Sequence, residues 1–201
     1  MDIYKTIIEK SEGLFKSRGS KFLSYAFPVK TEDEIKEILN QVKKEHHSAR
    51  HHCYAWRLGT EEITFRANDD GEPSSTAGKP ILGQLLSFEL TNTLVVVVRY
   101  FGGTLLGTSG LINAYRTAAA EAIKNAKIET RIIEEKFTLK FTYKEMNEVM
   151  QIIKQENLNI SDTRFELRCE LDFSVRKSEA ARIEEIFQQF YGVEIIKTTQ
   201  S

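Results

Sequence analysis

Residues 94–116 read LVVVVRYFGGTLLGTSGLINAYR, and this stretch decides the fold. An unbroken apolar run, Leu94–Val98, predicts a buried strand, and Arg99 follows where the run stops. A glycine-rich loop comes next, and Leu111 begins a run with helical spacing. The pattern therefore predicts a strand, a loop and a helix, with Arg99 at the carboxyl end of the strand, where a site can be built.

The glycine-rich loop is suited to an anion. A strand, a glycine-rich turn and a helix N-terminus together present backbone N–H groups and the positive end of a helix dipole. Thr108 or Ser109 could cap the helix or touch a phosphate. The loop matches neither of the standard phosphate-binding glycine motifs, however, and its glycines could equally serve close packing of two elements.

A long polar loop, residues 68–80, precedes this stretch and reads NDDGEPSSTAGKP. Loops of this length inside compact domains are often functional. Asp69, Asp70 and Glu72 could hold a hard cation, cap turns or face Arg99. Their spacing does not fit an EF-hand, so we expect no metal and no cofactor here.

Four histidines lie near Cys53, but no second ligand pair with zinc-like spacing follows them; they are His46, His47, His51 and His52. We expect solvated or capping histidines. His52, Tyr54 and Trp56 share one face of a strand, and this face could stack bases or a peptide if exposed, or could lie in the core. Cys53 and its neighbouring histidine point to opposite faces of that strand, so no nucleophile is convincing and we expect no catalytic residue.

Periodicity predicts a mixed α+β chain of two domains. Phe137–Tyr143 alternates as a half-buried strand, and the elements that follow give the order βαββαβ, a ferredoxin-like plan. The first half also mixes strands and helices. We place the boundary in a charged connector at about residues 128–136, with domains of residues 1–130 and 131–201.

The composition is that of an ordinary globular protein, with 41% hydrophobic and 28% charged residues. A net charge of -1 gives no argument for RNA or DNA, whose binders gain affinity by neutralising phosphates. No apolar run reaches the length of a membrane span. The N-terminus lacks an apolar signal core and the chain has only 2 cysteines, so we expect a cytoplasmic protein with reduced thiols.

Four segments together resemble the YigZ/IMPACT family. They are Lys16-Ser17-Arg18 leading to Lys21-Phe22; Ala49-Arg50-His51-His52-Cys53-Tyr54-Ala55-Trp56; Asp69-Asp70-Gly71-Glu72-Pro73 with Thr76-Ala77-Gly78-Lys79-Pro80; and Arg99-Tyr100-Phe101-Gly102-Gly103 through Leu106-Gly107. The first departs from the family pattern, because Gly19-Ser20 lengthens it. The resemblance covers nearly the whole chain, which is similar to the bacterial two-domain members.

The resemblance implies an N-terminal α/β domain like one of a small-subunit ribosomal protein. It also implies a C-terminal ferredoxin-like domain similar to the last domain of elongation factor G. Eukaryotic members regulate translation by competing for the activator of a starvation-responsive kinase of an initiation factor. Bacteria lack that kinase pathway, and for bacterial members a link to ribosomes or RNA follows from likeness of fold.

Two hypotheses of function follow. The first is a non-enzymatic binding protein that acts in translation or stress regulation through the ribosome, RNA or a protein partner. The alternative is an enzyme or sensor that binds a small phosphorylated ligand at the glycine-rich loop. Besides the His52, Tyr54 and Trp56 face, the candidate binding residues are Asp69, Asp70, Gly71, Glu72, Thr76, Gly78, Lys79, Arg99, Tyr100, Phe101, Gly102, Gly103, Gly107 and Ser109.

Overall fold

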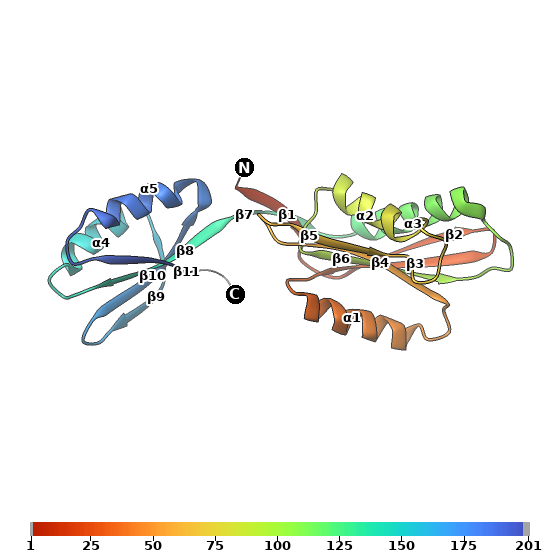
Figure 1. Ribbon diagram of the computed structural model, residues 1–201, viewed down its shortest axis with the longest axis horizontal. Coiled ribbons are helices and arrows are strands. Elements are labelled where there is room, and N and C mark those ends of the chain that lie inside the picture. Colours follow the sequence, from red (N-terminus) through yellow and green to blue (C-terminus); the bar gives the residue numbers. More distant parts are fainter. Residues whose placement is uncertain (1, 199–201) are drawn as a thin grey trace. The chain divides into compact units, whose positions relative to one another are not determined.

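The computed structural model describes residues 2–198 and divides into two compact units (Figure 1). The large unit is Tyr4–Arg131, and the small unit combines residues 2–3 with residues 132–198. The division falls inside two paired strands, β1 (Ile3–Ile7) and β7 (Ile128–Ile132), which form a separate two-stranded sheet. The sequence pattern indicated neither strand, and the charged connector expected at residues 128–136 contains β7 instead. Every residue of β7 is exposed, so it carries no burial pattern.

The large unit is built on a five-stranded antiparallel sheet in the order β2-β3-β6-β4-β5. Its strands are β2 (Ser11–Ser17), β3 (Ser20–Pro28), β4 (His51–Leu58), β5 (Thr64–Asn68) and β6 (Thr93–Tyr100), and its helices are α1 (Glu32–Glu45), α2 (Gly78–Ser87) and α3 (Gly107–Lys124). Helix α1 covers one face of the sheet, and α2 and α3 cover the other (Figure 1).

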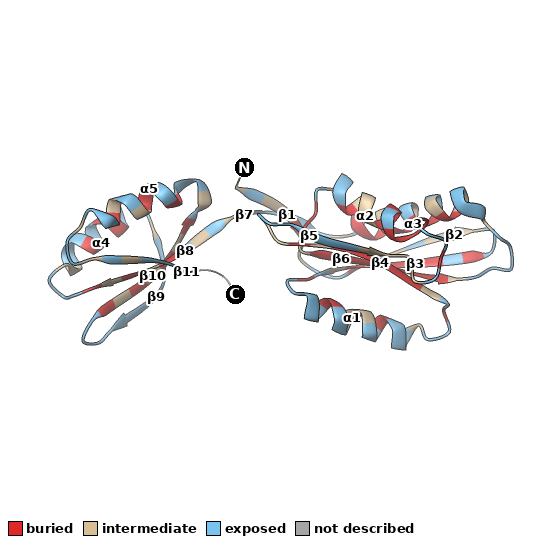
Figure 2. Ribbon diagram, in the orientation of Figure 1, coloured by how far each residue is buried: buried red, intermediate tan, exposed pale blue. Residues whose placement is uncertain are grey.

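The central strand β6 is buried from Thr93 to Arg99, as the apolar run predicts (Figure 2). Val95 and Val97 pack in the core beneath α2 and α3, whereas Val96 and Val98 pack in the core on the α1 side. Successive side chains of a strand point to opposite faces, so a strand covered on both faces must be apolar at every position.

Helix α3 packs closely on β2 and β3 because one of its faces carries small residues. Ser24 Oγ donates to Ala118 O at 2.6 Å, and Ser11 Oγ donates to Ala122 O at 2.7 Å. A Cβ on Gly13 would lie 2.6 Å from the backbone nitrogen of Ala122. Strand β2, which the sequence pattern did not indicate, is thus held by contacts to a helix far away in the sequence.

The small unit has the ferredoxin-like order βαββαβ, and its sheet order is β11-β8-β10-β9. Its elements are β8 (Glu134–Phe141), α4 (Met146–Gln155), β9 (Asn159–Phe165), β10 (Cys169–Arg176), α5 (Lys177–Gln188) and β11 (Glu194–Thr198). The alternating residues of β8 and β10 form one core with α4 and α5. The fold class predicted from the sequence, a two-domain α+β chain, is confirmed. Within residues 2–198, no helix has the length and apolar character needed to cross a bilayer.

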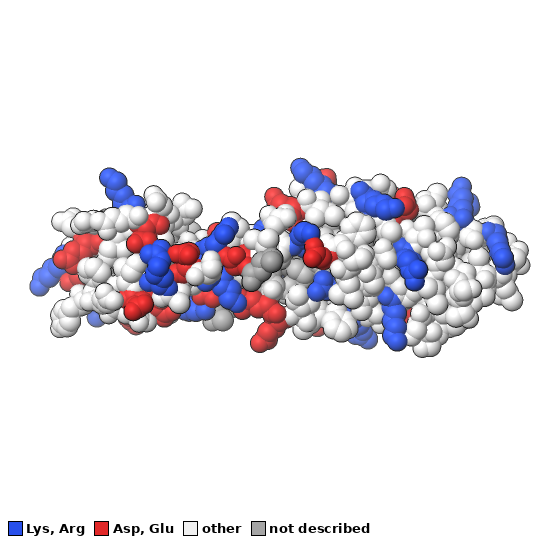
Figure 3. Space-filling view, turned by 90° about the horizontal axis from the view of Figure 1, so that it is seen from above, with Lys and Arg blue, Asp and Glu red and all other residues white. Residues whose placement is uncertain are grey.

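The sheet face of the small unit that no helix covers is polar, and its charged side chains form ion pairs with one another. Arg164 forms ion pairs with Asp162, Glu170 and Asp172, and Thr138 Oγ1 donates to Asp172 at 2.6 Å. Acidic and basic side chains also alternate over the small unit in Figure 3, whereas basic side chains of the large unit stand singly on the face seen there. Neither pattern resembles the basic groove of a nucleic-acid binder.

Candidate binding site

The acidic loop, residues 69–80, folds back onto the N-terminus of α2. Asp69 Oδ1 accepts hydrogen bonds from the backbone nitrogens of Ala77 at 3.0 Å and Gly78 at 2.8 Å, and its Oδ2 accepts from Ser75 N at 2.8 Å. Burial alone would raise the pKa of the Asp69 carboxyl, but these three backbone donors hold it below the ordinary value. Asp69 therefore supplies the anion that caps α2, whose N-cap residue Ala77 has no acceptor of its own.

The same loop is fastened to β4 and β5. Asp70 Oδ2 accepts from His52 N at 2.7 Å, and the Asp70 carbonyl accepts from His51 Nδ1 at 2.9 Å. A Cβ at Gly78 would lie 2.6 Å from Asn68 N, so α2 begins against β5 only because this residue is glycine.

The remaining candidates of the acidic loop shape its turns or face outward. Gly71 has φ +87°, a left-handed conformation that favours glycine. Thr76 Oγ1 donates to Pro73 O at 2.6 Å, so the Thr76 hydroxyl is used inside the loop. The Lys79 side chain is exposed. The structure therefore gives most acidic-loop candidates a role within the fold.

Glu72 joins the acidic loop to Arg99 in a buried cluster. Arg99 Nη1 donates to Glu72 Oε1 at 2.7 Å, and the Tyr115 hydroxyl donates to the same oxygen at 2.7 Å. The Arg99 residue is only 6% exposed, and Tyr115 is fully buried on α3. Sequence reasoning missed Tyr115, which lies one helical turn after Leu111 on the packed face of α3.

Aromatic rings enclose the Arg99 guanidinium. Its Cζ lies 5.5 Å from the ring centre of Phe22 and 5.6 Å from that of Phe101. Such contacts stabilise a desolvated cation. Arg99 Nε is nevertheless buried without a hydrogen-bond acceptor among the described residues.

The groups beside this cluster that could act as nucleophiles are held in their protonated forms. Burial raises the pKa of the Cys53 thiol and of the Tyr115 phenol far above their ordinary values. Cys53 Sγ donates to the carbonyl of Asp69 at 3.0 Å. The cluster is therefore suited to structure and binding rather than to nucleophilic attack.

The glycine-rich loop lies against the tip of the β2–β3 hairpin. Arg18 and Gly19 form a two-residue turn with φ of +45° and +79°, the positive values of a type I′ turn. The two residues that lengthen the family's first segment, Gly19 and Ser20, thus complete this turn and begin β3. A Cβ on Gly102 would lie 1.9 Å from the carbonyl carbon of Gly19, so this contact requires a glycine at residue 102.

A cavity of about 550 Å³ opens between the acidic loop and the glycine-rich loop, and we call it the loop cavity. Its lining residues are Arg50, His51, Glu72, Pro73, Arg99, Phe101, Leu105, Leu106, Gly107, Thr108 and Leu111. Phe101 is 51% exposed and Leu105 is 81% exposed, so the rim is apolar and open to solvent. Gly103 and Gly107 have φ of +87° and +72°, and the chain turns there to frame the cavity.

Helix α3 begins at the loop cavity without a side-chain cap. The sequence offered Thr108 or Ser109 as a helix cap or a phosphate contact; neither is the cap, because the N-cap residue is Leu106 and Thr108 lies inside the first turn. This turn contains no acidic residue, and Ser109 is exposed. Because the first amides of a helix lack intrahelical acceptors, this end presents N–H groups and the positive end of a dipole to the cavity.

The face formed by His52, Tyr54 and Trp56 is not an exposed stacking surface. His52 and Trp56 are buried, and Trp56 and Tyr54 pack in the core with residues of α1. Helix α1 covers this face of β4. Alternation in the sequence shows which residues share a face, but it does not show whether another element covers that face. Tyr100, another candidate, turns to the same side, where its hydroxyl lies 2.8 Å from His46 Nδ1. Within residues 2–198, no three His, Cys, Asp or Glu side chains gather in a metal-binding arrangement.

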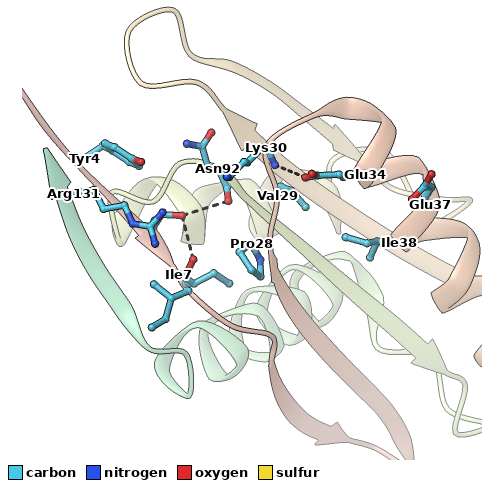
Figure 4. A pocket seen from close by; sticks show the side chains of 12 residues that line it. Tyr4, Ile7, Pro28, Val29, Lys30, Glu34, Glu37, Ile38, Asn92 and Arg131 are labelled. Atoms are coloured by element: carbon cyan, nitrogen blue, oxygen red, sulfur yellow. Dashed lines mark hydrogen bonds between the residues drawn. The ribbon is translucent and has the colours of Figure 1, made fainter. Parts of the chain in front are cut away.

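A second cavity, of about 480 Å³, lies elsewhere in the large unit. In Figure 4, Tyr4 and Arg131 line it from one side and Glu34 and Ile38 from the other, near Asn92. Thr6 Oγ1 lies 3.4 Å from the Asn92 carbonyl, and Glu34 Oε2 accepts from Lys30 N at 2.6 Å. The sequence could not indicate this cavity, because β1 and β7 were not recognised as strands.

Comparisons with known proteins agree with the family resemblance. The family model described as "Impact N-terminal domain" matches residues 18–123. The chain is similar to "IMPACT family member YvyE" of Bacillus subtilis, with 31% identity over 88% of this chain and 81% of the relative. It is also similar to "IMPACT family member YigZ" of Escherichia coli, with 34% identity over 75% of this chain and 72% of the relative.

The chain is also similar to a eukaryotic relative and to a solved structure. A "Protein IMPACT homolog" of Dictyostelium discoideum is 36% identical over 50% of this chain and 32% of its own length. A solved structure titled "Crystal structure of an hypothetical protein" aligns over 100% of both chains with a TM-score of 0.70 and 26% identity. The resemblance stated from the sequence motifs is confirmed at the level of the family.

Proposed function

Since the chain belongs to the IMPACT family, we propose that it is a non-enzymatic binding protein that acts in translation or stress regulation. Support comes first from the family, because the resemblance implies translational regulation for its eukaryotic members. It comes second from the loop cavity, where both family motif loops meet. The neighbouring Cys53 and Tyr115 are protonated and buried, which favours binding over catalysis.

The exposed apolar rim is the observation that carries the proposal. Phe101 and Leu105 are exposed at the rim of a cavity in which the Arg99 guanidinium is already paired with Glu72. Large exposed apolar side chains that cluster at one place mark contact surfaces. An apolar rim and a near-neutral charge together favour a protein component of the translation apparatus over a direct contact with RNA.

Co-sedimentation of the full chain with bacterial ribosomes at physiological salt tests the proposal. The wild type should pellet with ribosomes, and the double variant Phe101→Ala, Leu105→Ala should lose most of this association. The matched control is Phe65→Ala, Leu86→Ala, which removes an exposed phenylalanine and an exposed leucine from the same unit but away from the cavity. This control should pellet like the wild type.

Three results would count against the proposal. No association of the wild type at physiological salt overturns the ribosome version. Equal loss in both double variants shows that the rim is not the contact. Association that falls steeply with salt and persists on protein-free ribosomal RNA makes RNA the partner. Urea unfolding of each variant separates lost binding from lost folding.

A further inference from the structure

We infer that the loop cavity receives an acidic peptide segment of a partner protein. One bulky apolar side chain of this segment enters the cavity, and carboxylates on either side of it meet Arg18 and Arg50. The inference rests on the proposed function and deepens it, because it names the chemistry that the partner must present to the rim.

The first observation is the apolar character of the cavity. Its apolar lining residues are Pro73, Phe101, Leu105, Leu106 and Leu111, and Phe101 and Leu105 are exposed. Its volume of about 550 Å³ lies in the range of pockets that enclose a ligand. Protein interfaces are commonly anchored by one large side chain that fills such a pocket. The cavity can therefore bury an aromatic or branched apolar side chain of a partner.

The second observation is the sign of the free charges that border the cavity. Arg50 lines the cavity and is exposed. Arg18 is also exposed and stands at the rim, because its Nη1 lies 3.5 Å from the carbonyl oxygen of Leu105. Within residues 2–198, neither arginine forms an ion pair. Both guanidinium groups are therefore open to carboxylates of a partner.

The carboxylates that could neutralise this rim are already occupied. Glu72 is the acidic residue among those that line the cavity, and it is buried against Arg99 and Tyr115. Asp69 accepts backbone hydrogen bonds at the start of α2. Residues 100–120 contain no acidic residue. The rim is thus cationic although the whole chain carries a net charge of -1, and a complementary partner carries negative charge.

The topology sets the spacing of the two arginines. Arg18 lies in the turn that leads into β3, and Arg50 immediately precedes β4. Strands β3 and β4 pair with β6 on its two sides. At a strand spacing of about 4.8 Å, the chain positions that carry the arginines are roughly 10 Å apart. Because three residues of extended chain span about 10 Å, carboxylates on both sides of one apolar residue match this separation.

A nucleic acid fits these observations less well than a peptide does. Grooves that bind nucleic acids carry clustered cations along the path of the backbone. Here two arginines border a mainly apolar cavity, and the ring that lines it is that of Phe101. An apolar anchor with charged neighbours is the chemistry of a peptide, so we commit to a peptide and make a nucleic acid an outcome of the test.

The test begins with selection from a random dodecapeptide library displayed on phage, against the immobilised full chain. Sequences enriched on the wild type, and not on the double variant Phe101→Ala, Leu105→Ala, should share one pattern. We expect an aromatic or branched apolar residue with Asp or Glu on both sides. The enriched peptides are then synthesised with a fluorescent label, and their affinity is measured by fluorescence anisotropy.

Charge reversal separates the rim from the rest of the surface. Arg18→Glu and Arg50→Glu should each weaken a selected peptide at least about 10-fold, since each replaces an attractive charge pair with a repulsive one. The matched control Arg66→Glu reverses an exposed arginine on β5 that does not line the cavity. Because salt screens distant charges, this control should bind within about 2-fold of the wild type. Urea unfolding of each variant separates lost binding from lost folding.

The inference is overturned if no sequence is enriched, if the enriched sequences carry no excess of Asp and Glu, or if Arg50→Glu binds the peptide like the wild type. Displacement of the peptide by polyuridylate that itself binds more tightly makes a nucleic acid the occupant and also overturns it. Ribosome co-sedimentation is read separately. Ribosome association without acidic peptides removes this inference alone, whereas peptide binding at the rim without ribosome association removes the ribosome version of the proposed function alone.

Discussion

Helices α2 and α3 each begin at the end of a family motif loop, yet their N-termini are completed in different ways. Helix α2 receives the Asp69 carboxylate, which accepts three backbone hydrogen bonds. Within the described part of the chain no side chain caps helix α3, and its first residues line the same cavity as Arg99 and Arg50. The two family motif loops therefore differ in structure: the acidic loop caps its own helix from within, while the glycine-rich loop supplies no side-chain cap to the helix that follows it.

The largest expected effect comes from breaking the ion pair that joins the two loops. Arg99→Ala leaves the Glu72 carboxylate buried, with Tyr115 as its one side-chain donor among residues 2–198. Loss of one partner of a buried pair costs about 3–5 kcal/mol, so urea unfolding should show a decrease of this size. The double variant Arg99→Ala, Glu72→Ala should recover part of it. A decrease below about 1 kcal/mol would show that the pair does not hold the loops together.

Removing the internal cap of α2 should have the next largest effect. Asp69→Ala orphans the amides of Ser75, Ala77 and Gly78, and we expect a loss of about 2–3 kcal/mol in unfolding free energy. Asp33→Ala is the control, because Asp33 is an exposed carboxylate in the first turn of α1 and should cost less than about 1 kcal/mol. Equal losses in the two variants would show that Asp69 stabilises the protein no more than an ordinary surface carboxylate does.

The Asp69 cap should also depend on pH. Because the folded-state pKa of Asp69 lies below the ordinary value of 3.8 for a free aspartate, its stabilisation is present above that value and is lost as the pH falls through the folded pKa. The stability difference between the wild type and Asp69→Asn should therefore shrink between pH 5 and pH 2. A difference that grew toward low pH would contradict the sign of this linkage.

A smaller effect is expected at the hydroxyl that completes the cluster. Tyr115→Phe keeps the ring packed against Phe22 and removes the hydroxyl that donates to Glu72, which keeps Arg99 as a donor. We expect a loss of about 1–2 kcal/mol in urea unfolding. A loss as large as that of Arg99→Ala would mean that the tyrosine, rather than the arginine, satisfies Glu72.

The smallest effect on stability is expected at Arg50, an exposed residue that lines the loop cavity. Arg50→Ala removes an exposed side chain that forms no ion pair with the described residues, so the unfolding free energy should change by less than about 0.5 kcal/mol. Urea unfolding of the wild type and of the variant, side by side, measures this difference. A large loss of stability would mean that Arg50, like Arg99, helps to hold the fold together.

Strands could be predicted from the sequence where burial leaves a recognisable pattern of apolar residues. The unbroken apolar run predicted β6, and the alternation of apolar and polar residues predicted β8 and β10. Strands β2 and β7 could not be recognised, because β7 is exposed throughout and β2 depends on Gly13 meeting α3. The tertiary contact, rather than local propensity, makes these segments strands.

The two loops of the candidate site could be picked out from the sequence, but the contacts of their residues depend on partners distant in the sequence. Glu72 and Arg99 are 27 residues apart, and Tyr115 is 43 residues from Glu72, so no local pattern indicates that they share an oxygen. Arg50 lies in a family segment but was not selected, since its place at the cavity follows from the turn before β4. The binding roles of the candidate residues stay predictions.

The contact between Gly19 and Gly102 has a practical consequence for anyone who modifies this protein. An exposed two-residue hairpin turn is usually a good place for an inserted tag or a labelled side chain. Here the backbone of the glycine-rich loop packs directly against the turn, and an added Cβ on either Gly19 or Gly102 would collide with the other residue. A label at this tip would push the glycine-rich loop away and report on a damaged cavity, so a probe belongs on an exposed helical position such as Arg116.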